Sequence, residues 1–276
     1  MRTVIMRFDR SHTAIRDILL DLKKEPLKKN KSFIQITLLL MAVTAIAAQH
    51  IPNFKEIPVL CYHNIDIKPA RENELRISAF HFEQQVKALY DSGYHTILPG
   101  QLYDHLTKGT PLPSKPVMLT FDDSHETHFS LAAPVLEKYA FRGVFFIMTV
   151  CIGKKNYLSA QQIKMLAERG HAVECHTYDH PPVINITAEQ WEQQLDNPVK
   201  KLEAITGKRV EYFAYPFGIW NETAIIELKK RGIKAAFRLT GKKSSTEPLY
   251  TIKRIIVPGT WSEKYLQKEM ARAFPQ

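Results

Sequence analysis

The chain contains 276 residues, of which 45% are hydrophobic and 24% are charged, a composition that excludes a protein disordered throughout. The length suits a single catalytic domain of the size of an α/β barrel. The formal net charge is +10, but half of this excess lies in residues 1–31, so the rest of the chain is too weakly basic to indicate a nucleic-acid partner.

An apolar segment follows the basic N-terminal residues. It spans residues 33–48, three lysines precede it closely, and it ends in the small-residue pattern Ala-Ile-Ala. These features are typical of a secretory signal, and the segment is at the short end for a membrane-spanning helix. We expect a basic arm over residues 1–31, a signal or membrane anchor over residues 32–49, and a folded domain over residues 50–276, either secreted or anchored outside the cytoplasm. The arm is longer than a signal needs, so it is a cytoplasmic tail before an uncleaved anchor or translation starts downstream.

Short apolar or β-branched runs recur from residue 57 onward, and continuous runs of this length are typical of strands buried on both faces. The predicted strands cover residues 57–62, 116–121, 143–150, 171–177, 211–216, 233–239 and 251–257. Capped helical patterns lie between them and predict helices over residues 78–93, 158–170, 187–207 and 221–232, with Pro198 bending or splitting the third. Strands that alternate with helices indicate parallel βαβ units and hence a barrel-like α/β fold with about seven parallel strands.

Polar side chains gather at the ends of four of the predicted strands. Because the carboxyl ends of parallel strands meet at one edge, where the chemistry of such folds collects, we expect these residues to share one site. They are His63 after the first strand, Asp122 and Asp123 after the second, His176 and His180 after the fourth, and the turn YPFG at residues 215–218 after the fifth.

The adjacent carboxylates of Asp122 and Asp123 suggest a bound cation. Two like charges side by side are unfavourable in a dry pocket unless a cation compensates them. Two histidines and one carboxylate with an open position form a hydrolytic metal site, and the second carboxylate can then take a proton from the attacking water. On spacing alone, however, structural histidines at 176 and 180 and a solvated or helix-capping Asp pair remain the simpler interpretation.

Three motifs together resemble a known enzyme family. TFDDS, HTYDHP and YPFG occur in this order and resemble the motifs of the polysaccharide deacetylases, carbohydrate esterase family four, over roughly residues 57–260. PVLCYHNI, at residues 58–65, resembles the opening motif of the branch that acts on poly-N-acetylglucosamine. The resemblance implies a distorted (β/α) barrel and a metal-dependent hydrolase that removes N-acetyl groups from a polysaccharide containing N-acetylglucosamine. Its partners would be this acetylated polymer and, if residues 33–48 stay uncleaved, the membrane, with no nucleic acid.

The resemblance also implies roles for single residues. Asp122 is similar to the family's catalytic base. Asp123, His176 and His180 are similar to the ligands of one divalent metal, for which we expect zinc. His63 takes the place of a general acid that other branches carry on a late histidine, because no histidine follows His180 in this chain.

The YPFG turn and its surroundings carry the remaining predictions. The resemblance implies that the backbone near Tyr215, with Pro216 in the same turn, helps to hold the oxyanion. Trp220 either stacks on a sugar ring or only packs. One position departs from the family: Ala214 stands where an arginine usually positions the base. An alternative function is therefore a catalytically weak or inactive carbohydrate-binding pseudoenzyme of the same fold.

Two other groups of side chains compete for roles in the site. His125 and His128 follow Asp123 closely and could replace the later histidines as ligands, but the HTYDHP match is longer and we favour it. Cys61 and Cys175 stand beside site histidines, where a nucleophilic role is conceivable. The three cysteines lie in apolar stretches without metal-binding spacing, so we expect buried thiols.

Overall fold

The computed structural model describes residues 56–275, which belong to one compact unit. The predicted arm over residues 1–31 and the predicted signal or anchor over residues 32–49 lie outside the described residues and stay predictions. Among the helices of residues 56–275, none combines the length and the apolar character that a membrane span requires.

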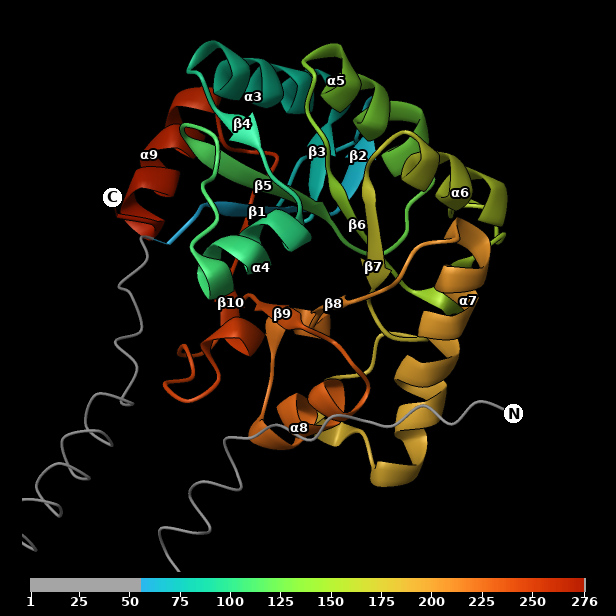
Figure 1. The fold of residues 1–276 in the computed structure, drawn as a ribbon. Coiled ribbons are helices and arrows are strands. Elements are labelled where there is room, and N and C mark those ends of the chain that lie inside the picture. Colours follow the sequence, from blue (N-terminus) through green and yellow to red (C-terminus); the bar gives the residue numbers. More distant parts are fainter. Residues whose placement is uncertain (1–55, 276) are drawn as a thin grey trace, which may run out of the picture. The chain divides into compact units, whose positions relative to one another are not determined.

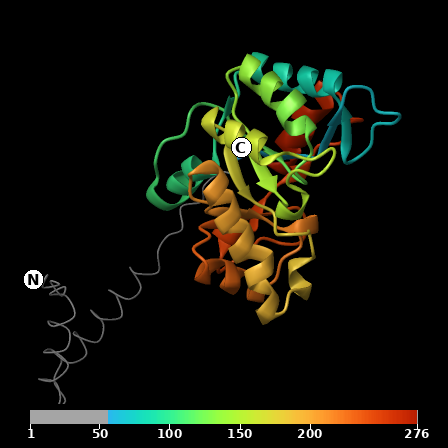
Figure 2. The same cartoon turned by 90° about the vertical axis from the view of Figure 1, so that its right-hand side faces the viewer.

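All seven predicted strands are present and pair in parallel, the last one divided into two short strands. In chain order they are β1 (Val59–Tyr62), β5 (Pro116–Phe121), β6 (Val144–Ile147), β7 (Ala172–Cys175), β8 (Tyr212–Ala214), β9 (Ala235–Arg238), β10 (Ile252–Lys253) and β11 (Ile255–Ile256). The sequence did not reveal three further short strands, β2 (Asn64–Asp66), β3 (Arg76–Ser78) and β4 (His95–Thr96). Figure 2 shows the connection between β2 and β3 projecting from the side of the barrel.

The two edge strands of the main sheet, β10 and β11, follow each other directly in the chain. The strand order is β10-β9-β8-β7-β6-β5-β1-β11, and only Arg254 separates β10 from β11. The Arg254 N–H donates to the carbonyl of Arg238 on β9, while the Val257 N–H donates to the carbonyl of Cys61 on β1, each at 2.9 Å. The chain thus joins the edges into a distorted (β/α) barrel, which confirms the predicted fold class and places Arg254 at the seam.

Helices surround the barrel, as Figure 1 shows. The predicted helices begin at capping side chains: Ser78, Ser159 and Asn221 each accept a hydrogen bond from a first-turn N–H. The predicted helix over residues 187–207 is divided as expected. Its earlier part ends in a π-helical turn, Glu192–Asp196, and Pro198 lies in the first turn of α7, which follows. The helices are α3 (Ala79–Asp91), α4 (Pro99–Lys108), α5 (Ala133–Lys138), α6 (Ala160–Glu168), α7 (Asn197–Thr206), α8 (Glu222–Lys230) and α9 (Glu263–Ala273).

The hydrophobic core has two parts because side chains alternate along each strand. On β6, Phe145 and Ile147 pack under the helices, whereas Val144 and Phe146 point into the barrel. The inner part includes Leu102 of α4, so this helix covers one end of the barrel interior. The opposite end, where the carboxyl ends of the strands lie, is left for polar residues.

Candidate active site

The site residues lie in loops with unusual backbone conformations. Asp123, Thr177, His180 and Phe217 all have positive φ, between 58° and 74°, although none of them is glycine. Such conformations cost of order 1–3 kcal/mol each and persist only where the surrounding structure holds them. These residues are concentrated in the motif segments after β5, β7 and β8. The surrounding structure therefore holds the site in backbone conformations that its residues do not favour by themselves.

Asp123, His176 and His180 bring their ligand atoms together. One atom from each lies within 4.8 Å of the others, and Asp123 Oδ1 is 3.6 Å from Nε2 of both histidines. Zinc bonds of about 2.0–2.2 Å in tetrahedral geometry would separate such ligand atoms by about 3.4 Å. Asp123 Oδ1 is buried and has no hydrogen-bond partner within residues 56–275. The three side chains therefore fit a divalent metal with only small adjustments.

His176 is oriented for this role by a second contact. Its Nδ1 donates to the Ala214 carbonyl at 2.7 Å, which leaves Nε2 as the nitrogen that faces Asp123. Burial alone would lower the pKa of His176, but the carboxylates of Asp122 and Asp123 raise it. The site therefore attracts positive charge.

Asp122 is held by Arg254 rather than by the metal cluster. The Arg254 guanidinium donates to both carboxylate oxygens, at 2.7 Å and 2.8 Å, and both side chains are almost fully buried. Burial by itself would raise the pKa of Asp122, but Arg254 outweighs it and lowers the pKa to about 2. Asp122 is therefore a fixed, ionised carboxylate beside Asp123. Sequence reasoning missed Arg254, although one arginine within the apolar run 251–257 was a usable signal.

His63 lies on the Asp122 side of the site. One of its ring nitrogens lies within 4.8 Å of an Asp122 oxygen, and its Nδ1 is buried without a hydrogen-bond partner. His128 Nε2 donates to the His63 carbonyl at 2.6 Å and so fixes the backbone there. Burial lowers the pKa of the His63 ring, against the opposite effect of the two carboxylates.

The hydrogen bonds of the YPFG turn limit which backbone N–H near Tyr215 could hold an oxyanion. The Tyr215 N–H already donates to the Phe237 carbonyl at 3.1 Å, and the Tyr215 hydroxyl donates to the Tyr250 carbonyl at 3.0 Å from inside the core. Tyr215 thus cannot offer its N–H to an oxyanion, because β9 has taken it. Pro216 has no N–H to offer.

A neighbouring N–H in this turn is available instead. The Phe217 N–H has no backbone acceptor within residues 56–275. The Phe217 ring is 53% exposed and lies edge-on to His180, with 4.5 Å between the ring centroids. Trp220 is half-buried and packs against the core, and its contact with sugar stays a prediction.

The competing side chains have other contacts. His128 is buried, its pKa is lowered to about 3 by burial, and it supports the His63 backbone. His125 stacks on Tyr157 with the rings 16° from parallel. Neither histidine belongs to a potential metal cluster among the described residues. All three cysteines are free and buried, as predicted, and burial raises the pKa of Cys175 to about 12, which argues against a nucleophile.

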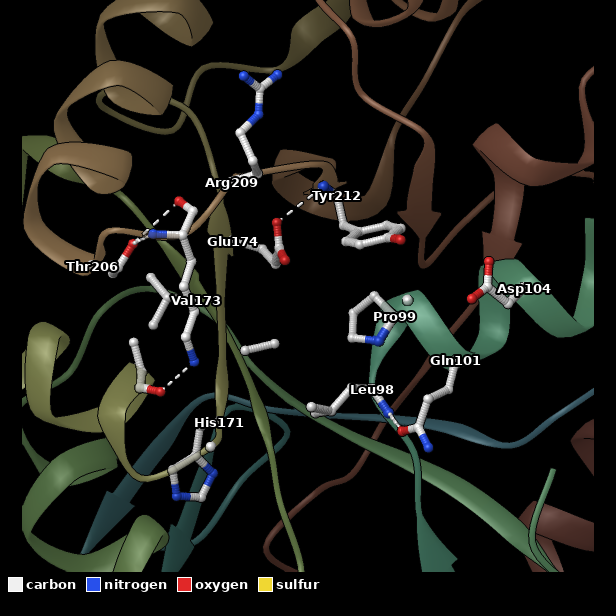
Figure 3. A pocket seen from close by; sticks show the side chains of 15 residues that line it. Leu98, Pro99, Gln101, Asp104, His171, Val173, Glu174, Thr206, Arg209 and Tyr212 are labelled. Carbon is white, nitrogen blue, oxygen red and sulfur yellow. Dashed lines mark hydrogen bonds between the residues drawn. The ribbon is translucent and has the colours of Figure 1, made fainter. Parts of the chain in front are cut away.

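A cavity of about 430 Å³ lies away from these residues (Figure 3). It opens at the amino ends of β7 and β8, beside the first turn of α4, whereas the site follows the carboxyl ends. The Glu174 carboxylate accepts hydrogen bonds there from the N–H groups of Glu211 and Tyr212, at 3.1 Å and 3.0 Å. Because β7 and β8 pair only at Cys175 and Phe213, this carboxylate satisfies N–H groups that the sheet leaves unpaired.

Comparison with known proteins agrees with this geometry. Residues 109–236 match the polysaccharide deacetylase family. The Bacillus subtilis (strain 168) protein YxkH, whose name places it among the polysaccharide deacetylases, is 30% identical over 206 residues, which cover 74% of this chain and 72% of YxkH. The chain belongs to the polysaccharide deacetylase family.

Two further comparisons are informative. A poly-beta-1,6-N-acetyl-D-glucosamine N-deacetylase of Staphylococcus aureus is 27% identical over 198 residues, or 66% of this chain and 67% of the relative. The structure of the Streptococcus pyogenes deacetylase PplD in complex with acetate superposes with a TM-score of 0.71 at 24% identity, covering 78% of this chain and 98% of PplD. At that identity the superposition supports the fold alone.

Proposed function

We propose that this deacetylase is a metal-dependent hydrolase that removes N-acetyl groups from a polysaccharide containing N-acetylglucosamine. The observation that carries the proposal is the convergence of Asp123, His176 and His180 on one point, directly beside an ionised Asp122. The similarity to a poly-beta-1,6-N-acetyl-D-glucosamine N-deacetylase supports the choice of substrate.

Asp123, His176 and His180 would hold the metal, for which two imidazoles and one carboxylate favour zinc. When bound, zinc would supply Lewis acidity toward the acetyl carbonyl and lower the pKa of a water molecule. The unpartnered Asp123 Oδ1 and the orientation of His176 by the Ala214 carbonyl support this donor set.

The protein's own groups would carry the proton transfers. Asp122, positioned by Arg254, accepts a proton from the attacking water. The Phe217 N–H, which lies in the turn near Tyr215 where the resemblance implies an oxyanion donor, donates to the carbonyl oxygen as it gains negative charge. His63 donates a proton to the departing nitrogen as the carbon–nitrogen bond breaks, which yields acetate and a sugar amine.

The pseudoenzyme alternative rested on Ala214, because an arginine that positions the base is expected at that position. Arg254 contacts Asp122 through both carboxylate oxygens from the seam of the barrel. The chain therefore carries an arginine beside the proposed base, although it comes from the connection between β10 and β11 rather than from the end of β8. We favour an active enzyme on this ground.

Acetate release tests the proposal. The purified full chain is incubated with N-acetylglucosamine oligomers, with and without a chelator and after zinc is added back, and Asp122→Asn serves as a matched variant. We expect release that the chelator abolishes, zinc restores and the variant lacks. Metal binding without release by the unmodified chain would favour the carbohydrate-binding alternative.

We also propose that the catalytic domain works outside the cytoplasm, either secreted or anchored through residues 33–48. The basic flank and the apolar segment support this location. Its partner would be the acetylated polymer, and the weakly basic charge of the domain provides no argument for nucleic acid.

A further inference from the structure

A second group of metal-ligating side chains lies beside the candidate metal site. Cys61, His63 and Asp122 each place one ligand atom within 4.8 Å of the other two. Cys61 and His63 are two residues apart on and after β1, so their side chains share one face. Asp122 follows β5, whose register with β1 pairs Cys61 with Thr120 and so brings Asp122 alongside His63. The pairing of two adjacent strands therefore builds this cluster.

The spacing of the cluster suits a thiolate-binding metal. The Cys61 thiol donates a hydrogen bond to Asp122 Oδ2, with 3.5 Å between the sulfur and the oxygen. Zinc–sulfur and zinc–oxygen bonds of about 2.3 Å and 2.0–2.2 Å in tetrahedral geometry would separate these two atoms by about 3.5 Å. The third potential ligand is His63, whose Nδ1 is buried and has no hydrogen-bond partner among the described residues. Cys61 and Asp122 thus have the separation that two ligands of one zinc ion require. His63 has a ring nitrogen whose lone pair or proton takes part in no hydrogen bond among the described residues.

We propose that Cys61, His63 and Asp122 form a second, inhibitory metal site that takes a thiophilic divalent cation, such as Zn²⁺ or Cd²⁺, when the metal is in excess. Binding forms a metal–sulfur bond and releases the thiol proton to solvent. The inhibition rests on the proposed function, because the cation would occupy both the base and the general acid. The binding itself does not depend on that function.

The charges around the cluster explain why this site fills second. The Arg254 guanidinium already contacts Asp122, and a cation bound by Asp123 would be close, since His176 Nε2 is 3.8 Å from Asp122 Oδ2. Positive charge on two sides lowers the affinity for a second dication. Among the described residues, in contrast, Asp123 forms ion pairs with His176 and His180 and with no arginine.

Cys61 determines which cations can bind. Only a metal with high affinity for sulfur gains enough from this buried thiol to displace its proton. Mg²⁺ and Mn²⁺ prefer oxygen ligands and gain little from a thiolate. The site should therefore distinguish Cd²⁺ and Zn²⁺ from these harder cations.

Cadmium provides a direct spectroscopic test on the full chain. The protein is titrated with Cd²⁺, and the ultraviolet charge-transfer band of cadmium–thiolate bonds is followed together with acetate release. Cys61→Ala removes the thiolate and Cys61→Ser keeps the size of the side chain. Cys175→Ala is the matched control, because Cys175 is an equally buried thiol outside the cluster. Cys151→Ala tests the third thiol, and melting curves verify that each variant folds.

We expect the band to appear after the first equivalent, to persist in the Cys175 and Cys151 variants and to vanish in both Cys61 variants. Acetate release should fall by about the 10²–10⁴-fold that acid–base catalysis contributes, and Mg²⁺ should not cause this loss. The proposed second metal site would be refuted if the folded unmodified protein showed no band, or if the band survived Cys61→Ser. A normal band with undiminished release would overturn the inhibition. A chain that shows the band but never releases acetate would contradict the proposed function and not the metal site.

Discussion

Arg254→Gln should affect both stability and the pH dependence of turnover. Arg254 and Asp122 are 0% and 1% exposed, and two hydrogen bonds of 2.7 Å and 2.8 Å join them. Glutamine removes the positive charge and leaves a buried carboxylate without its partner. Breaking a buried ion pair in this way costs about 3–5 kcal/mol. For a domain of this size we expect the melting temperature to fall by roughly 6–20 °C.

The sign of the pH effect follows from the pKa of Asp122. In the unmodified protein Arg254 lowers this pKa from 3.8 to about 2, so the ion pair stabilises the fold above pH 3.8 and this contribution is lost as the pH falls toward 2. Without Arg254, burial is no longer outweighed and the pKa should rise by about 1–3 units. The variant should therefore lose more stability at neutral pH than in acid, and the acid limb of its turnover profile should move upward.

Urea unfolding in acid and at neutral pH measures the free energy of unfolding of the variant. Acetate release measured against pH locates the acid limb of its turnover profile. Arg238→Gln is a suitable control, because Arg238 is also buried but donates only to the carbonyls of Thr251 and Gly241. The control should lose stability without any shift of the acid limb. A loss below about 1 kcal/mol together with an unmoved limb in Arg254→Gln would refute the reasoning.

Four further outcomes are expected. His63→Ala should lower acetate release by about 10²–10⁴-fold while metal content, measured by mass spectrometry, is kept, and near-normal release would remove His63 from the mechanism. Asp123→Ala should lose the bound metal whereas His125→Ala keeps it, so equal metal contents would contradict the assigned ligands. Gly218→Ala should lower the melting temperature, because φ is +67° and the new methyl group would lie 2.3 Å from a neighbouring backbone nitrogen; an unchanged value would contradict this. Fractionation should recover the full chain outside the soluble cytoplasm, and full-length protein found there would refute targeting by residues 33–48.

The sequence by itself predicted the seven strands and the proximity of the three candidate metal ligands. Continuous apolar runs identify strands that are buried on both faces, and parallel strands must end at the same edge. Such strands are followed by Asp123, His176 and His180. The proximity of these three side chains could therefore be predicted without atomic coordinates. The sequence did not reveal the helices α4, α5 and α9 or the short strands β2, β3 and β4, because short or weakly patterned segments depend on packing against the barrel for their structure.

The contacts around the proposed base were decided only by the tertiary structure. Arg254 lies 132 residues from Asp122, and they meet because Arg254 stands at the seam where the last strands close the barrel. Near Tyr215, where an oxyanion donor is predicted, the Tyr215 N–H donates to the Phe237 carbonyl of β9, whereas the Phe217 N–H has no backbone acceptor among residues 56–275. Strand periodicity predicts which face of the sheet a side chain occupies but not which strands close the barrel or which N–H groups they use, because these depend on how the whole sheet curves.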